Sequence, residues 1–138
     1  MAQKLKPNSK IKDLWKKACS VQKRSYSPYS KYSVGAALLG KSGRVFTGTN
    51  VENASYGATI CAERSAVLKA ISEGERSFVA ICVVVRGHAV PPCALCLQVL
   101  SEFVEGDFQV WTGTLRSLGE SFRLDSLLPK RFGPKDLS

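Results

Sequence analysis

The order of helix-like and strand-like segments predicts an α/β fold, with a mixed sheet that carries helices on its faces. Apolar residues recur at helical spacing in three segments, and four other segments have the composition of strands. Along the chain these segments read helix, strand, strand, helix, strand, helix, strand, which is typical of a helix-covered sheet. With 138 residues and 44% apolar side chains, the chain is expected to form one domain around one core.

The first elements are one helix and a pair of strands. Ser9 can cap a helix over residues 9–24, because Ser accepts hydrogen bonds from the free N–H groups of a first turn. This helix dominates an expected N-terminal basic amphipathic segment, residues 1–25. Residues 34–39 and 44–49 are predicted to be two strands, joined by a turn that contains Lys41-Ser42-Gly43.

The later elements alternate between helix and strand. A helix is expected over residues 61–72, whose alanine, valine and isoleucine residues fall on one side. Residues 78–85 form a nearly continuous apolar run rich in β-branched side chains, which is typical of a buried central strand. Residues 93–104 are predicted to form a third helix and residues 108–111 a further strand.

Two cysteine motifs are the most informative feature of the sequence: Cys61-Ala62-Glu63-Arg64 and Pro92-Cys93-Ala94-Leu95-Cys96. Three thiolates suit Zn²⁺, and three protein ligands leave the fourth tetrahedral position open for a water. A water bound to zinc becomes acidic enough to act as a nucleophile. Glu63 stands two residues after the first thiolate and is expected to move the proton of that water. The motifs therefore predict a hydrolytic zinc centre.

A closed structural zinc site with four cysteines is the alternative reading. Cys19 or Cys82 would have to supply its fourth ligand, because structural sites fill all four positions. Cys19 falls on the expected first helix and Cys82 inside the apolar run, and neither belongs to a Cys-x-x-Cys pair. Both are therefore interpreted as small core residues.

Both motifs begin expected helices, and this placement favours thiolate over thiol. The unpaired N–H groups and the positive dipole end of a helix N-terminus lower the pKa of a cysteine. Three thiolates outweigh the charge of one Zn²⁺ ion, so a nearby cation is needed to offset the excess. Arg64 is the expected source of this charge compensation.

Further blocks stand in order around these motifs. They are Pro28-Tyr29-Ser30-Lys31-Tyr32, Val34-Gly35-Ala36-Ala37-Leu38-Leu39 and Asn50-Val51-Glu52-Asn53-Ala54-Ser55-Tyr56, with a closing segment at residues 125–138. From about Tyr26 onward the chain resembles the small, homotetrameric, three-cysteine branch of the cytidine deaminases. The resemblance implies a three-layer α-β-α cytidine deaminase-like fold, in which a mixed five-stranded sheet carries helices on both faces. The whole chain, residues 1–138, would then be one such domain.

The resemblance also implies an activity, which is hydrolytic deamination of cytidine and deoxycytidine to the uridines with release of ammonia. One Zn²⁺ per chain would be held by Cys61, Cys93 and Cys96, and Glu63 would carry the proton of the attacking water to the cytosine ring. The implied substrate-binding residues are Asn50 and Glu52 at the ribose, Tyr32 at the base, Ala62, and Tyr56 and Phe132 from neighbouring subunits of a homotetramer. On the residues alone, Asn50 could equally serve a turn and Tyr32 the core.

Three departures from the family pattern concern the second motif and the base. Ala94 and Leu97 stand where the family usually has glycine and arginine, and Tyr32 stands where phenylalanine is common. Without the arginine, we expect a less acidic zinc-activated water and slower turnover. Ala94 is expected to restrict a backbone that glycine would leave free. The loop at residues 86–91 is also slightly shorter than the corresponding loop of the family pattern.

The charge of the chain leaves a second class of substrate open. The net charge is +9, and nine of the twenty basic residues precede Tyr32. They read either as a nucleic-acid footprint or as the solvated face of the first helix, and the apolar residues opposite favour the solvated face. A deaminase of single-stranded polynucleotide is thus an alternative, as are a deaminase of a modified cytosine nucleoside and an inactive zinc-binding relative.

The location expected from the sequence is the cytosol. No apolar run approaches the length that spans a bilayer, and the lysine-rich N-terminus lacks the apolar stretch of a signal peptide. Five cysteines, three of them assigned to zinc, fit a reducing compartment. No membrane partner is expected.

Overall fold

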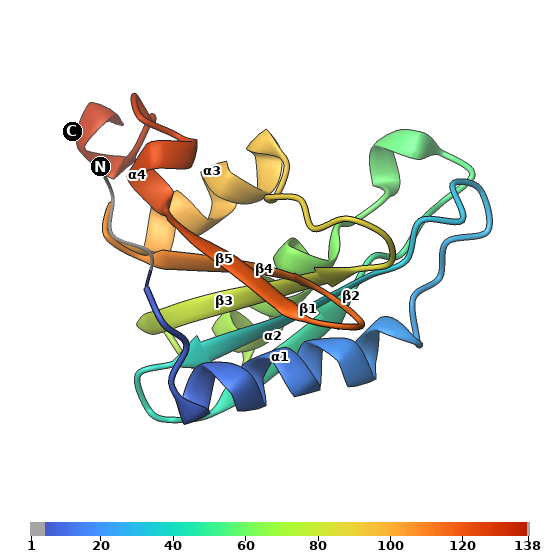
Figure 1. Cartoon of the computed structure of the whole chain (residues 1–138). Coiled ribbons are helices and arrows are strands. Elements are labelled where there is room, and N and C mark those ends of the chain that lie inside the picture. Colours follow the sequence, from blue (N-terminus) through green and yellow to red (C-terminus); the bar gives the residue numbers. More distant parts are fainter. Residues whose placement is uncertain (1–4, 138) are drawn as a thin grey trace.

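The computed structural model describes residues 5–137 and shows a five-stranded mixed sheet between two layers of helices (Figure 1). The strand order across the sheet is β2-β1-β3-β4-β5. Strands β3 and β4 are parallel, and every other neighbouring pair is antiparallel. The strands are β1 (Val34–Gly40), β2 (Val45–Thr49), β3 (Phe78–Val85), β4 (Gln109–Thr114) and β5 (Leu118–Arg123).

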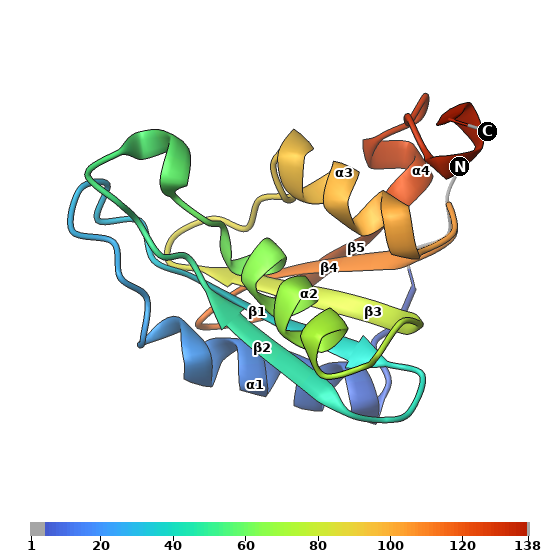
Figure 2. The ribbon, with the colours of Figure 1, turned by 180° about the vertical axis from the view of Figure 1, so that it is seen from behind.

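The helices cover both faces of this sheet, as the two views of the ribbon show (Figures 1 and 2). Helix α1 packs on one face and helices α2 and α3 pack on the other, so the core is divided into two clusters of buried residues. This arrangement confirms the expected α-β-α layers. The helices are α1 (Ser9–Gln22), α2 (Ala62–Ser72), α3 (Ala94–Phe103) and α4 (Leu124–Leu127), with 3₁₀ turns at Tyr56–Ala58 and Pro134–Leu137.

Two glycines allow the helices to lie close to the sheet. A Cβ atom at Gly35 in β1 would meet the carbonyl oxygen of Ala18 in α1 at 2.3 Å. A Cβ atom at Gly48 in β2 would meet the backbone nitrogen of Ala66 in α2 at 2.5 Å. Only glycine fits at such short separations, so these positions fix the depth at which α1 and α2 are seated.

The boundaries differ from the sequence predictions in ways that have local causes. Helix α1 is capped by Asn8 rather than Ser9, because the Asn8 carboxamide accepts a hydrogen bond from the N–H of Ile11 at 2.9 Å. The pattern of apolar residues did not indicate β5 or α4. Strand β5 is an edge strand with mostly polar, partly exposed residues, so it lacks the apolar alternation that reveals a strand.

The ends of the two expected terminal segments lie outside the described residues. Residues 1–4 of the segment 1–25 and residue 138 of the segment 125–138 belong to this undescribed part. Within residues 5–137, no helix is long and apolar enough to cross a membrane.

Candidate metal centre and active site

The three motif cysteines lie together between the N-termini of α2 and α3. Cys61 and Cys93 are the N-cap residues of these helices, and Cys96 is buried in the first turn of α3. The Sγ atom of Cys93 lies 3.9 Å from that of Cys61 and 3.5 Å from that of Cys96, and all three sulfurs lie within 4.8 Å of one another. Tetrahedral Zn²⁺ with Zn–S bonds of about 2.3 Å separates its sulfurs by roughly 3.8 Å. The donor set therefore fits a zinc ion.

The cluster contains three ligands and no fourth. Among the described residues, no other His, Cys, Asp or Glu joins it. Cys82 belongs to the buried cluster on the α1 face of the sheet, and the thiol of Cys19 lies 3.9 Å from the carbonyl oxygen of Thr114 on that same face. The reading as a closed four-cysteine site is therefore wrong, because the sheet separates both cysteines from the cluster.

Arg64 is the cation nearest to the thiols. Its Nη2 atom donates to Cys61 Sγ at 3.5 Å, and its buried Nε atom has no hydrogen-bond partner. Hydrogen bonds from Cys96, Arg64 and Cys93 lower the pKa of Cys61 to about 5, against the opposing effect of burial. The pKa of Cys96 is raised, because its thiol donates to Cys61 and because it is buried. The geometry thus gives Arg64 the position from which it can compensate thiolate charge.

Glu63 is the second residue of α2 and points its carboxyl group into a buried position beside the cluster. Only 5% of the residue is exposed. Burial, followed by the nearby charge of Cys61, raises the pKa of Glu63 to about 7. A carboxyl group with a pKa near neutrality can both accept and donate a proton, which is what a proton-transfer residue needs.

A pocket of about 390 Å³ opens directly onto Glu63 and two of the thiols. This volume lies within the range of small-molecule sites, and the lining combines an apolar floor with a few polar groups. The floor is formed where β1 begins and β3 ends. The lining residues are Ser30, Tyr32, Val34, Asn50, Glu52, Thr59, Cys61, Ala62, Glu63, Val83, Val85, Val90, Pro91 and Cys93.

Asn50 and Glu52 line this pocket and also hold its rim together. The buried Asn50 carboxamide donates from Nδ2 to the carbonyl oxygen of Tyr32 at 2.7 Å and accepts at Oδ1 from the N–H of Val34 at 3.0 Å. Glu52 Oε1 accepts from the N–H groups of Tyr29 and Ser30, each at 3.0 Å. The Ser30 hydroxyl donates to Glu52 Oε2, and these bonds lower the pKa of Glu52. The turn chemistry that the sequence left open for Asn50 is therefore present, beside an accessible pocket.

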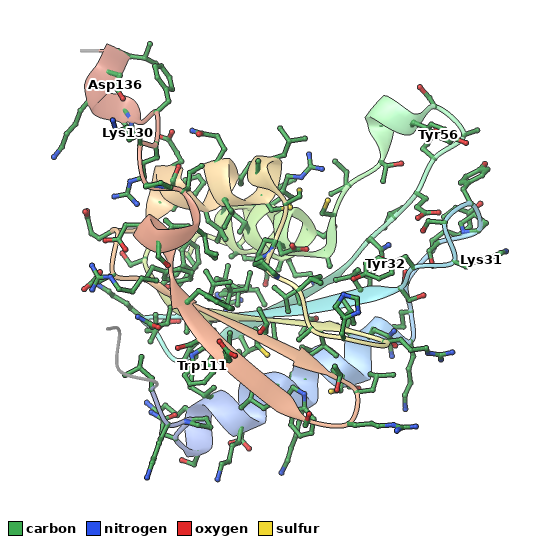
Figure 3. The ribbon with its side chains drawn as sticks, turned by 45° about the horizontal axis from the view of Figure 1, so that its top comes forward. Lys31, Tyr32, Tyr56, Trp111, Lys130 and Asp136 are labelled. Carbon is green, nitrogen blue, oxygen red and sulfur yellow. The ribbon has the colours of Figure 1, made fainter. Side chains whose placement is uncertain are left out.

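The aromatic residues singled out from the sequence lie in different places. Tyr32 lines the pocket and is 44% exposed, so it is not a core residue. Burial and the nearby Glu63 carboxylate raise the pKa of its phenol. Tyr56 and Phe132 do not line the pocket of their own chain. Tyr56 lies on the 3₁₀ turn Tyr56–Ala58 (Figure 3). Its ring packs edge-to-face against that of Tyr29 with ring centroids 6.2 Å apart, and the carbonyl oxygen of Phe132 accepts from the side chain of Gln98.

The two departures in the second motif have a structural explanation. Ala94 is the first residue of α3, where an alanine favours the helical backbone, so the expected restriction causes no misfit. Leu97 is buried and belongs to the core cluster under α2 and α3, so an apolar side chain fits this position. The pocket residues that the sequence did not indicate are Ser30, Val34, Thr59, Val83, Val85, Val90 and Pro91. Val34 begins β1, and Val83 and Val85 belong to the last three residues of β3, so their place at strand termini is a signal that could have pointed to them.

Comparison with known proteins identifies the family. A family model described as the cytidine and deoxycytidylate deaminase zinc-binding region matches residues 8–112, which include all three cysteines and Glu63. The chain belongs to this family. Cytidine deaminase of Halalkalibacterium halodurans is 46% identical over 126 residues, covering 91% of this chain and 96% of the relative. The relative from Sporosarcina psychrophila, also a cytidine deaminase, is 44% identical over 118 residues, covering 85% of this chain and 87% of its own.

Solved structures agree with the fold. The crystal structure of cytidine deaminase from Burkholderia pseudomallei superposes with a TM-score of 0.83 at 38% identity, over 88% of this chain and 98% of that chain. The crystal structure of the Mycobacterium tuberculosis enzyme gives a TM-score of 0.76 at 37% identity, over 88% of this chain and 96% of that chain. The expected cytidine deaminase-like fold is thereby confirmed. The zinc-binding region of this hydrolase family contains the cluster of Cys61, Cys93 and Cys96.

Proposed function

We propose that the chain catalyses the zinc-dependent hydrolytic deamination of cytidine and deoxycytidine to uridine and deoxyuridine, with release of ammonia. One observation carries the proposal: a buried carboxyl group, Glu63, lies beside three clustered thiols at the bottom of a nucleoside-sized pocket. The relatives named above are cytidine deaminases, which supports this substrate class.

The proposed reaction follows from the position of Glu63. Cys61, Cys93 and Cys96 would hold zinc, which would supply the Lewis acidity that makes a water nucleophilic near neutral pH. Glu63 takes a proton from the water that adds to C4 of the cytosine ring and passes that proton to N3. Glu63 then carries the second proton of the water to the exocyclic amino group, the C4–N bond breaks, and ammonia leaves. The raised pKa of Glu63 suits a group that must both accept and donate protons.

Asn50 and Glu52 are proposed to bind the sugar. Glu52 is ionised, and its carboxylate borders the pocket with lone pairs that its three hydrogen bonds leave free. The Nδ2 group of Asn50 has a second proton beyond the one given to Tyr32. An acceptor and a donor at one rim match a ribose hydroxyl. Tyr32, Ala62 and the strand-end valines then face the base.

The choice of a free nucleoside over a polynucleotide rests on where the positive charge lies. The exposed lysines of α1 include Lys10, Lys12, Lys16 and Lys17. Helix α1 covers the face of the sheet opposite α2 and α3 (Figure 2). The pocket lies on the side of α2 and α3, because its lining includes Ala62 and Val83 of the core cluster on that side. A strand bound along α1 would therefore not lead into the pocket. The proposed substrate is therefore a free nucleoside. For an enzyme with this substrate, we propose a role in pyrimidine salvage in the cytosol.

A homotetramer is proposed as the active form. Tyr56 is 77% exposed and Phe132 is 55% exposed, and both lie outside the pocket of their own chain. Large exposed aromatic side chains favour a contact with another subunit. In the tetramer these residues would complete the pocket of a neighbour, so turnover per chain should fall when the protein is diluted to monomers.

The test of the proposed function is ultraviolet loss of cytidine and deoxycytidine with the zinc-loaded protein. The variant Glu63→Ala should retain zinc, and its kcat should fall by about 10²–10⁴-fold, which is the usual contribution of proton transfer by a side chain. Glu102→Ala removes an exposed carboxyl group from α3 and serves as the matched control. Undiminished turnover in Glu63→Ala would contradict the role of Glu63. One zinc per chain without any turnover would favour the inactive relative.

A further inference from the structure

A second cavity lies at the edge of the sheet where β3 and β4 end. Because these strands are parallel and Val85 pairs with Thr114, the loops that follow them leave the sheet side by side. Together the loops enclose about 400 Å³. Carboxyl ends of neighbouring parallel strands are where α/β sheets commonly place ligands. The cavity is lined by Arg86, Gly87, Thr114, Leu115 and Arg116.

The cavity is positively charged and its charges have no partner within residues 5–137. No acidic residue lines it, and the guanidinium groups of Arg86 and Arg116 make no ion pair or hydrogen bond among the described residues. A further cation, Lys23 at the C-cap of α1, acts on the thiol of Cys19. Cys19 lies against Thr114, and the charge of Lys23 partly offsets the burial that raises the pKa of Cys19.

The polar groups of the cavity match the oxygens of a phosphate. Guanidinium groups present paired N–H donors whose spacing fits phosphate oxygens. The hydroxyl oxygen of Thr114 accepts from the backbone N–H groups of Arg116 and Ser117, each at 3.2 Å, so its own proton remains to be donated. We propose that this cavity binds the phosphate group of a small ligand, either inorganic phosphate or a phosphomonoester.

The same loop connects this cavity to the nucleoside pocket. Arg86 and Gly87, at its beginning, line the second cavity, whereas Val90 and Pro91, four residues on, line the nucleoside pocket. Outside the helices and strands, no backbone–backbone hydrogen bond within residues 5–137 involves residues 86–92. A phosphate held by Arg86 therefore fixes a loop that has few other restraints. It also fixes the wall that Val90 and Pro91 give to the nucleoside pocket, and this second claim rests on the proposed function.

Calorimetric titration with inorganic phosphate tests the site directly. The zinc-loaded protein is titrated at constant ionic strength against a chloride background, and its zinc content is measured before and after. We expect saturable binding of one phosphate per chain. The variant Arg116→Gln should weaken it roughly tenfold, which is the usual contribution of a charge-assisted hydrogen bond. The variant Arg116→Lys should bind phosphate more tightly than Arg116→Gln but less tightly than the unmodified protein, since it keeps the positive charge and lacks the paired N–H donors of a guanidinium.

The control variant is Lys10→Gln, which removes one positive charge from the exposed first turn of α1. It should leave phosphate affinity unchanged. Absence of saturable binding, or equal weakening in Lys10→Gln and Arg116→Gln, would overturn the site. A single-stranded oligodeoxynucleotide without terminal phosphates contains only phosphodiesters, so it distinguishes a site for phosphate or a phosphomonoester from a surface that binds polynucleotide. Tight binding of this oligonucleotide, with no binding of inorganic phosphate, would also overturn the proposal.

Cytidine turnover tests the link between the two cavities. A phosphate concentration just sufficient to saturate the unmodified protein should lower its KM for cytidine at least twofold, and the same concentration should lower KM less in Arg116→Gln. Phosphate binding without any change in KM would refute the role of the loop. If cytidine is not turned over at all while phosphate still binds, the proposed function fails and the phosphate site stands.

Discussion

The variant Gly48→Ala tests whether the close seating of α2 on β2 positions the catalytic carboxyl group. A Cβ atom at residue 48 would stand 2.5 Å from the nitrogen of Ala66 and 2.6 Å from the carbonyl oxygen of Ala62. Ordinary contacts begin at 3.4 Å, so the helix backbone has to move by about 0.9 Å to admit one methyl group. Backbone atoms cannot rotate away as a side chain could, so α2 moves as a unit and carries Glu63 with it.

The expected cost has two parts. Overpacking of this kind destabilises by about 1–3 kcal/mol. For a chain of this length, that cost lowers Tm by roughly 3–10 °C. A displacement of about 1 Å at the reacting groups can reduce turnover by about 100-fold. The control is Gly57→Ala, because a Cβ atom at Gly57 meets nothing within 4 Å, so the same methyl group should shift Tm by less than about 2 °C.

Thermal melting, zinc analysis and cytidine turnover of both variants decide the question. We expect Gly48→Ala to have a lower Tm and a lower kcat than the unmodified protein while it retains zinc. If Gly48→Ala has the same Tm and the same kcat as the unmodified protein, the reasoning is refuted, because α2 could not then lie where the structure places it.

Two further predictions concern the charged and buried thiols. Arg64→Gln removes the guanidinium that donates to Cys61, so competition with a chelator should show zinc held roughly tenfold more weakly; equal retention would argue against charge compensation by Arg64. Burial raises the pKa of Cys82 from 9.0 to about 12, so its contribution to stability is complete below about pH 9 and is lost as the pH rises toward 12. The alkaline decrease of Tm should be less steep in Cys82→Ala, and an unchanged slope would contradict the assignment.

The zinc centre was predictable from the sequence because its chemistry is local. Cys93 and Cys96 belong to one helical turn, and Glu63 follows Cys61 by two residues, so spacing alone indicates which groups share a site. Sequence spacing cannot show that segments distant in the chain are adjacent. The pairing of Val85 with Thr114, which creates the second cavity, depends on strand register and has no local signature.

The substrate pocket was only partly predictable for a related reason. Asn50 and Glu52 were identified through a resemblance, but their hydrogen bonds to residues 29–34 depend on how a loop folds back over β2. The apolar floor was missed because Val34, Val83 and Val85 look like ordinary strand residues in the sequence. The sequence pattern did not indicate edge strand β5, because its residues are mostly exposed or half-buried and do not alternate between apolar and polar.

The position of Cys61 and Cys93 at the starts of two helices has a consequence for how the chain folds. These residues are 32 positions apart, and the segment between them contains α2 and β3. A metal ion that joins them closes this segment into a loop, as a reversible cross-link would. By the chain-entropy relation for cross-links, closing a loop of this length lowers the conformational entropy of the unfolded chain. This loss raises the free energy of the unfolded chain by about 4 kcal/mol at 25 °C. Refolding should therefore be faster when zinc is present from the start than when it is withheld.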